Sequence, residues 1–230
     1  MLRLGGLAGM AAGLVSILVP AILFGLVPQA PAGSFKVEGG GQVDPTALVA
    51  MFPASRAAIS AGNFVDFVSS VLTLALFLSL FVALRRTKLA LALFGSALYI
   101  LGLAVLFTET VTQVAFDPIS NIYQAAGTTP AAQATLVLLW QATQGIFYEF
   151  DAAAVLLFSS GILVLGVAMY RAPGFGRAVG GLSTAFGVAG LLVTPIFGIT
   201  SSLVAFVLVP VFIVVPIMLG WKLYGLSKAS

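Results

Sequence analysis

The sequence predicts an all-α, polytopic membrane helical bundle with six transmembrane helices, short helices at the outer surface and both termini in the cytoplasm. Three observations lead to this prediction: the composition, six long apolar stretches and the distribution of charge. Of the 230 residues, 60% are hydrophobic and 7% are charged, whereas a soluble domain carries about 25% charged residues. A single soluble core could not cover so much apolar surface, so a lipid bilayer is the expected partner.

Six apolar stretches approach or exceed the length that crosses a bilayer, since a hydrocarbon core about 30 Å thick needs about 20 helical residues. Continuous runs of Leu, Ala, Val and Phe favour helices, because backbone polar groups in lipid must be paired within their own segment. The single transmembrane domain comprises residues 1–230, with spans at about 4–27, 61–84, 89–114, 147–170, 179–197 and 203–223 and outer loops at 28–60 and 115–146.

The charged residues separate between the two sides of this six-span arrangement. Eight of the ten cations fall on one side: Arg3, Arg85, Arg86, Lys88, Arg171, Arg177, Lys222 and Lys228. The two other cations fall on the opposite side, and all seven acids lie at or near that side. Cationic short loops stay in the cytoplasm during insertion, so the side with eight cations is predicted to be inside.

The first span has an alternative interpretation as a cleaved signal peptide. Arg3 supplies the charged start, and Ala30-Pro31-Ala32 is a small-x-small cleavage pattern. The apolar run of about 24 residues is longer than the usual signal core of 7–15 residues, which favours a membrane span.

Two outer segments carry helix-start signals. Asp44-Pro45 predicts an N-cap followed by proline in the first turn, and therefore a short surface helix over 45–60. Thr129-Pro130 predicts a second apolar helix over 131–144. Gly145 either separates that helix from the fourth span or lies inside one long protruding helix over 131–170. On the inner side, residues 172–176 predict a tight turn and not a phosphate loop, because no strand precedes them.

The residue types exclude several kinds of chemistry. The chain has no cysteine and no histidine, which removes disulfides, iron–sulfur clusters, the usual zinc sites and histidine-ligated haem. No catalytic residue, metal or cofactor is predicted. The net charge of +3 is scattered and forms no basic stripe, so nucleic acid is not an expected partner.

Small residues recur every four positions on two spans. They are Gly5, Gly9 and Gly13 on the first span and Gly181, Ala185 and Ala189 on the fifth. This spacing lets helix backbones approach closely. The stripes are expected to pack within the bundle, and the alternative is contact with another membrane protein subunit or a second copy in a homo-oligomer.

A candidate outer polar cluster combines three helices at one depth. Its members are Asn63, Asp66, Glu109, Gln113, Gln144, Tyr148 and Asp151. A charged group inside a membrane costs about 2.5–3.5 kcal/mol even on lenient scales, so each acid requires an explanation. One explanation is mutual hydrogen bonding, with Arg56 as a partner, that locks the helices together. The other is an outward-facing site for a cation, a proton or a cationic ligand.

Three strings, RLGGLAG at 3–9, GNFVDFVSSVLTLALFLSLFVALRR at 62–86 and YEFDAAAVLLFSSGILVLGVAMYRAPGFGRAVGGL at 148–182, carry a family resemblance. In the order of these strings along the sequence, the chain resembles the prokaryotic membrane family called domain of unknown function 4386 over nearly its whole length. Asp66 and Asp151 match the family's acids, but Arg56 lies ten residues before Asp66, farther than the family's usual arginine. The resemblance implies a six-helix protein of the prokaryotic plasma membrane and no established activity.

Three functional hypotheses follow. The first is a non-enzymatic structural or accessory membrane subunit, because catalytic residue types and a polar path through the membrane are missing from the sequence. The second is a small binding or transport protein that uses the outer carboxylates to take up a cation or amine. The third is a membrane-embedded enzyme that modifies lipid, since carboxylates alone can serve as acid and base.

Overall fold

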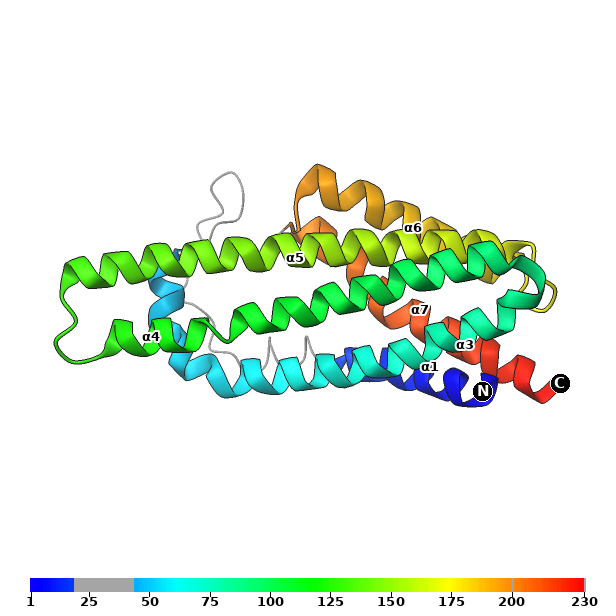
Figure 1. Cartoon of the computed structure of the whole chain (residues 1–230), viewed down its shortest axis with the longest axis horizontal. Helices are drawn as coiled ribbons and strands as arrows, with labels where there is room; N and C mark the ends of the chain where they lie inside the picture. Colours follow the sequence, from blue (N-terminus) through cyan, green and yellow to red (C-terminus); the bar gives the residue numbers. More distant parts are fainter. Residues whose placement is uncertain (19–43, 200, 230) are drawn as a thin grey trace.

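The computed structural model describes residues 1–18, 44–199 and 201–229, and every regular element in these ranges is a helix. The helices extend mainly along one axis, and both chain ends gather with the turn between α5 and α6 at one end (Figure 1). The elements are α1 (Leu2–Ser16), α3 (Pro45–Gln113), α4 (Phe116–Gln124), α5 (Pro130–Tyr170), α6 (Arg177–Phe197) and α7 (Ser202–Ala229).

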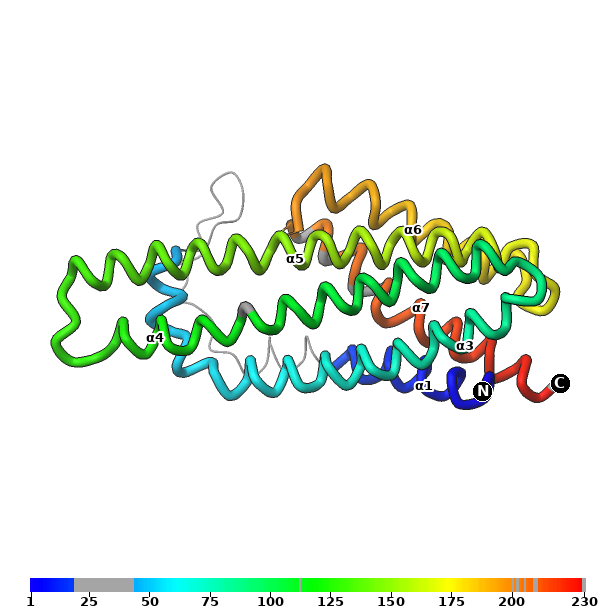
Figure 2. The backbone as a smooth tube through the Cα atoms, in the orientation of Figure 1, coloured from blue at the N-terminus to red at the C-terminus, as the bar shows by residue number. Residues whose placement is uncertain are grey.

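The long helix α3 reverses direction at Lys88, where the backbone leaves helical geometry (φ −145°, ψ 56°). Residues 45–87 and 89–113 therefore form two arms that run back along each other (Figure 2). Phe77 of the first arm stacks on Tyr99 of the second, with ring centroids 3.5 Å apart. The reversal lies between the second and third apolar stretches, where the cluster of cations predicted a turn.

Four helical stretches among the described residues are long and apolar enough to cross a membrane. They are Pro45–Gln124, which contains the reversal, Pro130–Tyr170, Arg177–Phe197 and Phe206–Lys228. The apolar helix α1 has 15 residues, and the part of the predicted first span beyond residue 18 lies outside the described residues. The helical fold class is confirmed, and the count of six crossings remains a prediction.

Helix α1 packs between α3 and α7 through its small residues. Gly5 and Gly9 face Ser79 and Leu76 of α3, and a Cβ atom on Gly13 would lie 2.5 Å from the carbonyl oxygen of Ile213 in α7. The hydroxyl of Ser69 donates to the carbonyl oxygen of Ala12 at 3.2 Å. The first glycine stripe therefore lies inside the bundle, where close backbone approach is required.

The predicted stripe on α6, Gly181, Ala185 and Ala189, is not the packed face, whose buried residues are Gly180, Ser183, Gly187, Gly190 and Thr194. Nothing lies within 4 Å of a Cβ atom placed on Gly181, and Ala185 is exposed. The neighbouring face packs against α5 instead, and a Cβ atom on Gly187 would lie 2.6 Å from the amide nitrogen of Leu163. Small residues occur on both faces of α6, so their spacing alone did not identify the packed one.

Helix α5 continues through Gly145 without a break and has 41 residues, which corresponds to about 60 Å at 1.5 Å per residue. That length is about twice the hydrocarbon thickness of a bilayer. Its first part, residues 130–146, packs with α4 and with residues 45–60 of α3; we call these three segments the head. The described residues of the predicted outer loops, 44–60 and 115–146, are thus mainly helical.

The head has its own small core. The rings of Phe52, Phe116 and Trp140 contact one another, with centroid distances of 4.3–6.1 Å. Both predicted helix starts are confirmed, since Asp44 accepts a 2.9 Å bond from the amide of Thr46 and Thr129 accepts from Ala132 at 3.3 Å. The predicted surface helices over 45–60 and 131–144 are not separate, because they continue into α3 and α5.

Candidate outer polar site

The two arms of α3 place Asp66 and Glu109 at one level of the bundle. The side-chain amide of Asn63 donates a hydrogen bond to the side-chain oxygen of Gln113, which pairs the two arms. One helical turn further from the head, Asp66 lies within electrostatic range of Glu109. The antiparallel register of the arms therefore brings together residues that are 43 positions apart in the sequence.

Helix α5 contributes the third acid. Because α5 is unbroken, Gln144, Tyr148 and Asp151 lie on one face, and Gln144 donates a 2.9 Å bond to the hydroxyl oxygen of Tyr148. Asp151 lies within electrostatic range of both Asp66 and Glu109. All seven residues of the predicted cluster thus belong to α3 and α5, which pack against each other. The two hydrogen-bonded pairs lie closer to the head than the three carboxylates do.

The three carboxylates differ in their surroundings. Glu109 is 6% exposed, whereas Asp66 and Asp151 are half-buried. Within the described residues, no hydrogen bond or ion pair joins Asp66 or Asp151 to another side chain.

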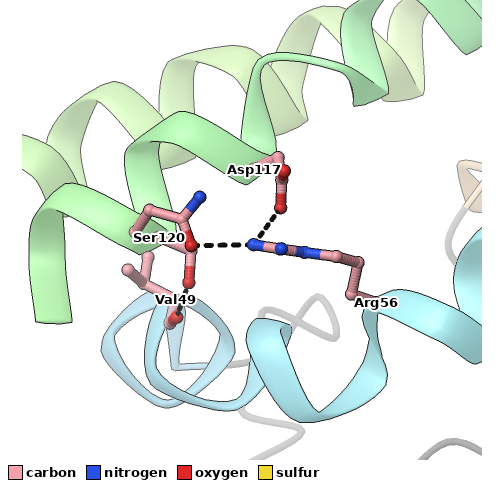
Figure 3. Close-up of polar contacts among 5 residues, drawn as sticks. Val49, Arg56, Asp117 and Ser120 are labelled. Carbon is pink, nitrogen blue, oxygen red and sulfur yellow. Dashed lines mark hydrogen bonds and ion pairs between the residues drawn. The ribbon is translucent and has the colours of Figure 1, made fainter.

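Arg56 does not neutralise this cluster. Its guanidinium lies 2.5 Å from a carboxylate oxygen of Asp117 and donates a 2.7 Å bond to Asn121, both on α4 (Figure 3). Both charged side chains are more than 40% exposed, so the pair adds only about 0–1 kcal/mol. The part of the structural explanation in which Arg56 pairs with the acids is wrong, because Arg56 belongs to the head.

The geometry of the acids also limits what they can bind. In the described part of the chain, no three acidic side chains converge as ligands of one metal ion. A hollow in the head beside Tyr123 and Val137 and another at the turn between α5 and α6 are both formed by described residues, and neither is lined by the three acids. The cluster is thus a group of one buried and two half-buried acids at the base of the head.

Two features of the site were missed by sequence reasoning. Tyr99 is 3% exposed, lies between Phe77 and Phe158 and is within electrostatic range of Asp66. An isolated tyrosine in an apolar span gives no periodic signal. The Arg56–Asp117 pair was also missed, although an acid in the first turn of a helix, as Asp117 is in α4, is a typical start signal.

No family model, no curated protein and no solved structure matches this chain. The resemblance to the domain of unknown function 4386 family therefore stays a prediction.

Proposed function

We propose that the chain is a multi-pass membrane protein that crosses the bilayer six times with both termini in the cytoplasm. We further propose that it works without catalysis, as an accessory subunit that binds another membrane or surface protein through its head. Membership of the domain of unknown function 4386 family and a place in a prokaryotic plasma membrane are parts of the same proposal.

The orientation is supported by the charges at the two ends of the bundle. Both chain ends, the reversal at Lys88 and the turn between α5 and α6 lie at one end (Figure 1), and the cations concentrate in these four places. The head and its acids lie toward the opposite end. Positively charged connections remain in the cytoplasm, so the head faces outward.

The accessory role is supported by one observation above all: the head exposes several large apolar side chains. Leu138, Leu139 and Ile146 of α5 are 66%, 50% and 53% exposed, and Ile122 of α4 is 54% exposed. About half of α5 extends beyond a bilayer of ordinary thickness, so these side chains project past the hydrocarbon core. Large apolar side chains that are exposed outside lipid favour contact with another protein.

The test uses the protein in its native membrane. Complexes are extracted with a mild detergent, and the protein mass of the particle is measured by light scattering on a size-exclusion column. We expect a particle heavier than the 23.6 kDa chain that becomes lighter in the variant Leu138→Glu with Leu139→Glu. These substitutions introduce two charges into the apolar face and should release the partner.

The matched control is Thr135→Glu with Gln141→Glu, on the same part of α5. Both residues are exposed, so this variant adds the same charge without removing large apolar side chains, and its particle should keep the full mass. A native particle of monomer mass, or equal dissociation by both variants, would remove the accessory role.

A second candidate function is supported by the carboxylates of Asp66 and Asp151. Among the described residues, neither forms an ion pair, and the nearby cation Arg56 pairs with Asp117 instead, which supports an outward-facing site for a monovalent cation or an amine. Binding of sodium and of an alkylammonium ion to the purified chain can be measured by calorimetry. Asp66→Asn with Asp151→Asn should abolish binding, whereas Glu149→Gln, an exposed acid on the same helix, should not. Unchanged binding in the double variant would eliminate this site.

A further inference from the structure

The turn between α5 and α6 contains an open hollow of about 630 Å³ that is lined by two arginines. Its lining comprises residues 170–174, Gly176 and Arg177. Arg171 follows the last residue of α5, and Arg177 is the first residue of α6. The turn that lines it lies at the end of the bundle that holds both chain ends, opposite the head (Figure 1).

The charge of this hollow is uncompensated within the described residues. Arg171 and Arg177 are exposed. Neither forms an ion pair with another described residue, since the ion pair found among these residues joins Arg56 and Asp117 in the head. The first turn of α6 contains no acid. A cation at a helix N-terminus is disfavoured by the helix dipole, so an anion held between the two arginines would relieve an unfavourable arrangement.

The turn is held in shape by its apolar residues. Ala172 and Phe175 are 7% and 3% exposed and belong to the core of the bundle. Gly176 has a φ of +86°, which favours glycine, and no atom lies within 4 Å of a Cβ atom placed there. Arg171 and Arg177 thus both line this space, and the backbone that carries them is anchored in the core by Ala172 and Phe175.

The surroundings of the hollow match the level of lipid headgroups. Tyr170 at its edge and Trp221 on α7 are 48% and 70% exposed, and such rings concentrate at membrane interfaces. One to two helical turns further into the bundle, Val167 and Leu182 are 42% and 50% exposed. A molecule with its charge in the hollow would find an apolar surface directly alongside it.

We propose that Arg171 and Arg177 bind the phosphate group of an anionic phospholipid, whose acyl chains lie along the apolar faces of α5 and α6. The inference rests on the proposed membrane location and is independent of the accessory role of the head. The recognition is a double ion pair from guanidinium groups to phosphate oxygens, a geometry for which arginine is well suited. The glycines shape the turn, and the arginines carry the specificity.

The experiment uses the full chain, purified and delipidated in a neutral detergent. Retention of phosphatidylglycerol and of phosphatidylcholine is titrated and read by native mass spectrometry. The chain should prefer phosphatidylglycerol, and Arg171→Gln with Arg177→Gln should weaken that binding about thirtyfold, since each basic group near an anionic lipid contributes about 1 kcal/mol, roughly a fivefold factor. Arg171→Lys with Arg177→Lys should retain part of the preference.

The matched control is Arg85→Gln with Arg86→Gln, which removes two charges from the other turn at the same end and should leave the preference intact. Equal losses in both glutamine pairs would overturn the site in favour of a general basic surface. Displacement of the lipid by inorganic phosphate at equal concentration would contradict a phospholipid as the ligand and would indicate a site for free phosphate. The comparison of phosphatidylglycerol with phosphatidylcholine and the competition with inorganic phosphate both use the unaltered chain. They therefore decide the proposal even if the variant Arg171→Gln with Arg177→Gln does not fold.

Discussion

Ser120 on α4 donates a 2.7 Å hydrogen bond to the carbonyl oxygen of Val49 on α3 (Figure 3). In a regular helix this carbonyl would accept the amide of residue 53, but residue 53 is proline and has no N–H to donate. Val49 and Ser120 are fully buried. The serine therefore satisfies an acceptor that the helix itself cannot, and it ties α4 to the first turns of α3.

We expect Ser120→Ala to destabilise the head by about 1–3 kcal/mol, the cost of leaving a buried acceptor unsatisfied. The loss should be local, because the bundle has a separate core. Hydrogen exchange of the purified chain in detergent should show faster exchange in residues 45–60 and 116–124, with no change in residues 155–170.

Pro53→Ala supplies the missing amide donor, and it provides the control for this argument. In the Pro53→Ala background, Ser120→Ala should cost less than in the native chain, because the alanine amide can then occupy the carbonyl of Val49. An identical cost in both backgrounds would show that the Ser120 hydroxyl does not compensate for the proline.

The two small-residue stripes should respond differently to the same substitution. Gly13→Val places methyl groups against the backbone of α7 and should destabilise the chain by about 1–3 kcal/mol or more through overpacking. Gly181→Val extends into open space and should be close to neutral. Thermal denaturation of the two variants in the same detergent measures both effects, and a larger loss for Gly181→Val would contradict the packing of α1 and α6.

Gly145 lies inside α5 with nothing within 4 Å of a Cβ atom placed there. Because alanine is favoured over glycine in a helix interior, Gly145→Ala should stabilise the middle of α5 by up to about 1 kcal/mol. Slower hydrogen exchange in residues 140–150 is the expected result. Faster exchange would indicate that the glycine serves a break between two helices.

The proposed orientation can be tested with single cysteines, since the chain has none of its own. Ala126 in the connection between α4 and α5 and Ala178 near the start of α6 are both exposed. In intact cells, a membrane-impermeant maleimide should label Ala126→Cys and should label Ala178→Cys only after permeabilisation. The reverse pattern would invert the topology, and labelling of both in intact cells would contradict a membrane crossing between them.

Local signals predicted much of this structure. The caps at Asp44 and Thr129 and the reversal at Lys88 each depend on a few neighbouring residues, so they can be read from the chain directly. The common level of Asp66, Glu109 and Asp151 was also predictable, because helical rise and alternating direction together determine depth along the bundle axis.

The sequence by itself determined the helical class and the apolar character of the long helices, since composition and periodicity depend on no distant contact. Only the tertiary structure decided which face of α6 packs, whether α5 continues through Gly145, and that Arg56 pairs with Asp117 rather than with the acids. Each of these depends on which side chains of other helices lie within a few ångströms. The small residues of α6 lie on two faces, and Arg56 has more than one acid as a possible partner. Which face packs and which acid pairs is decided only when the helices pack.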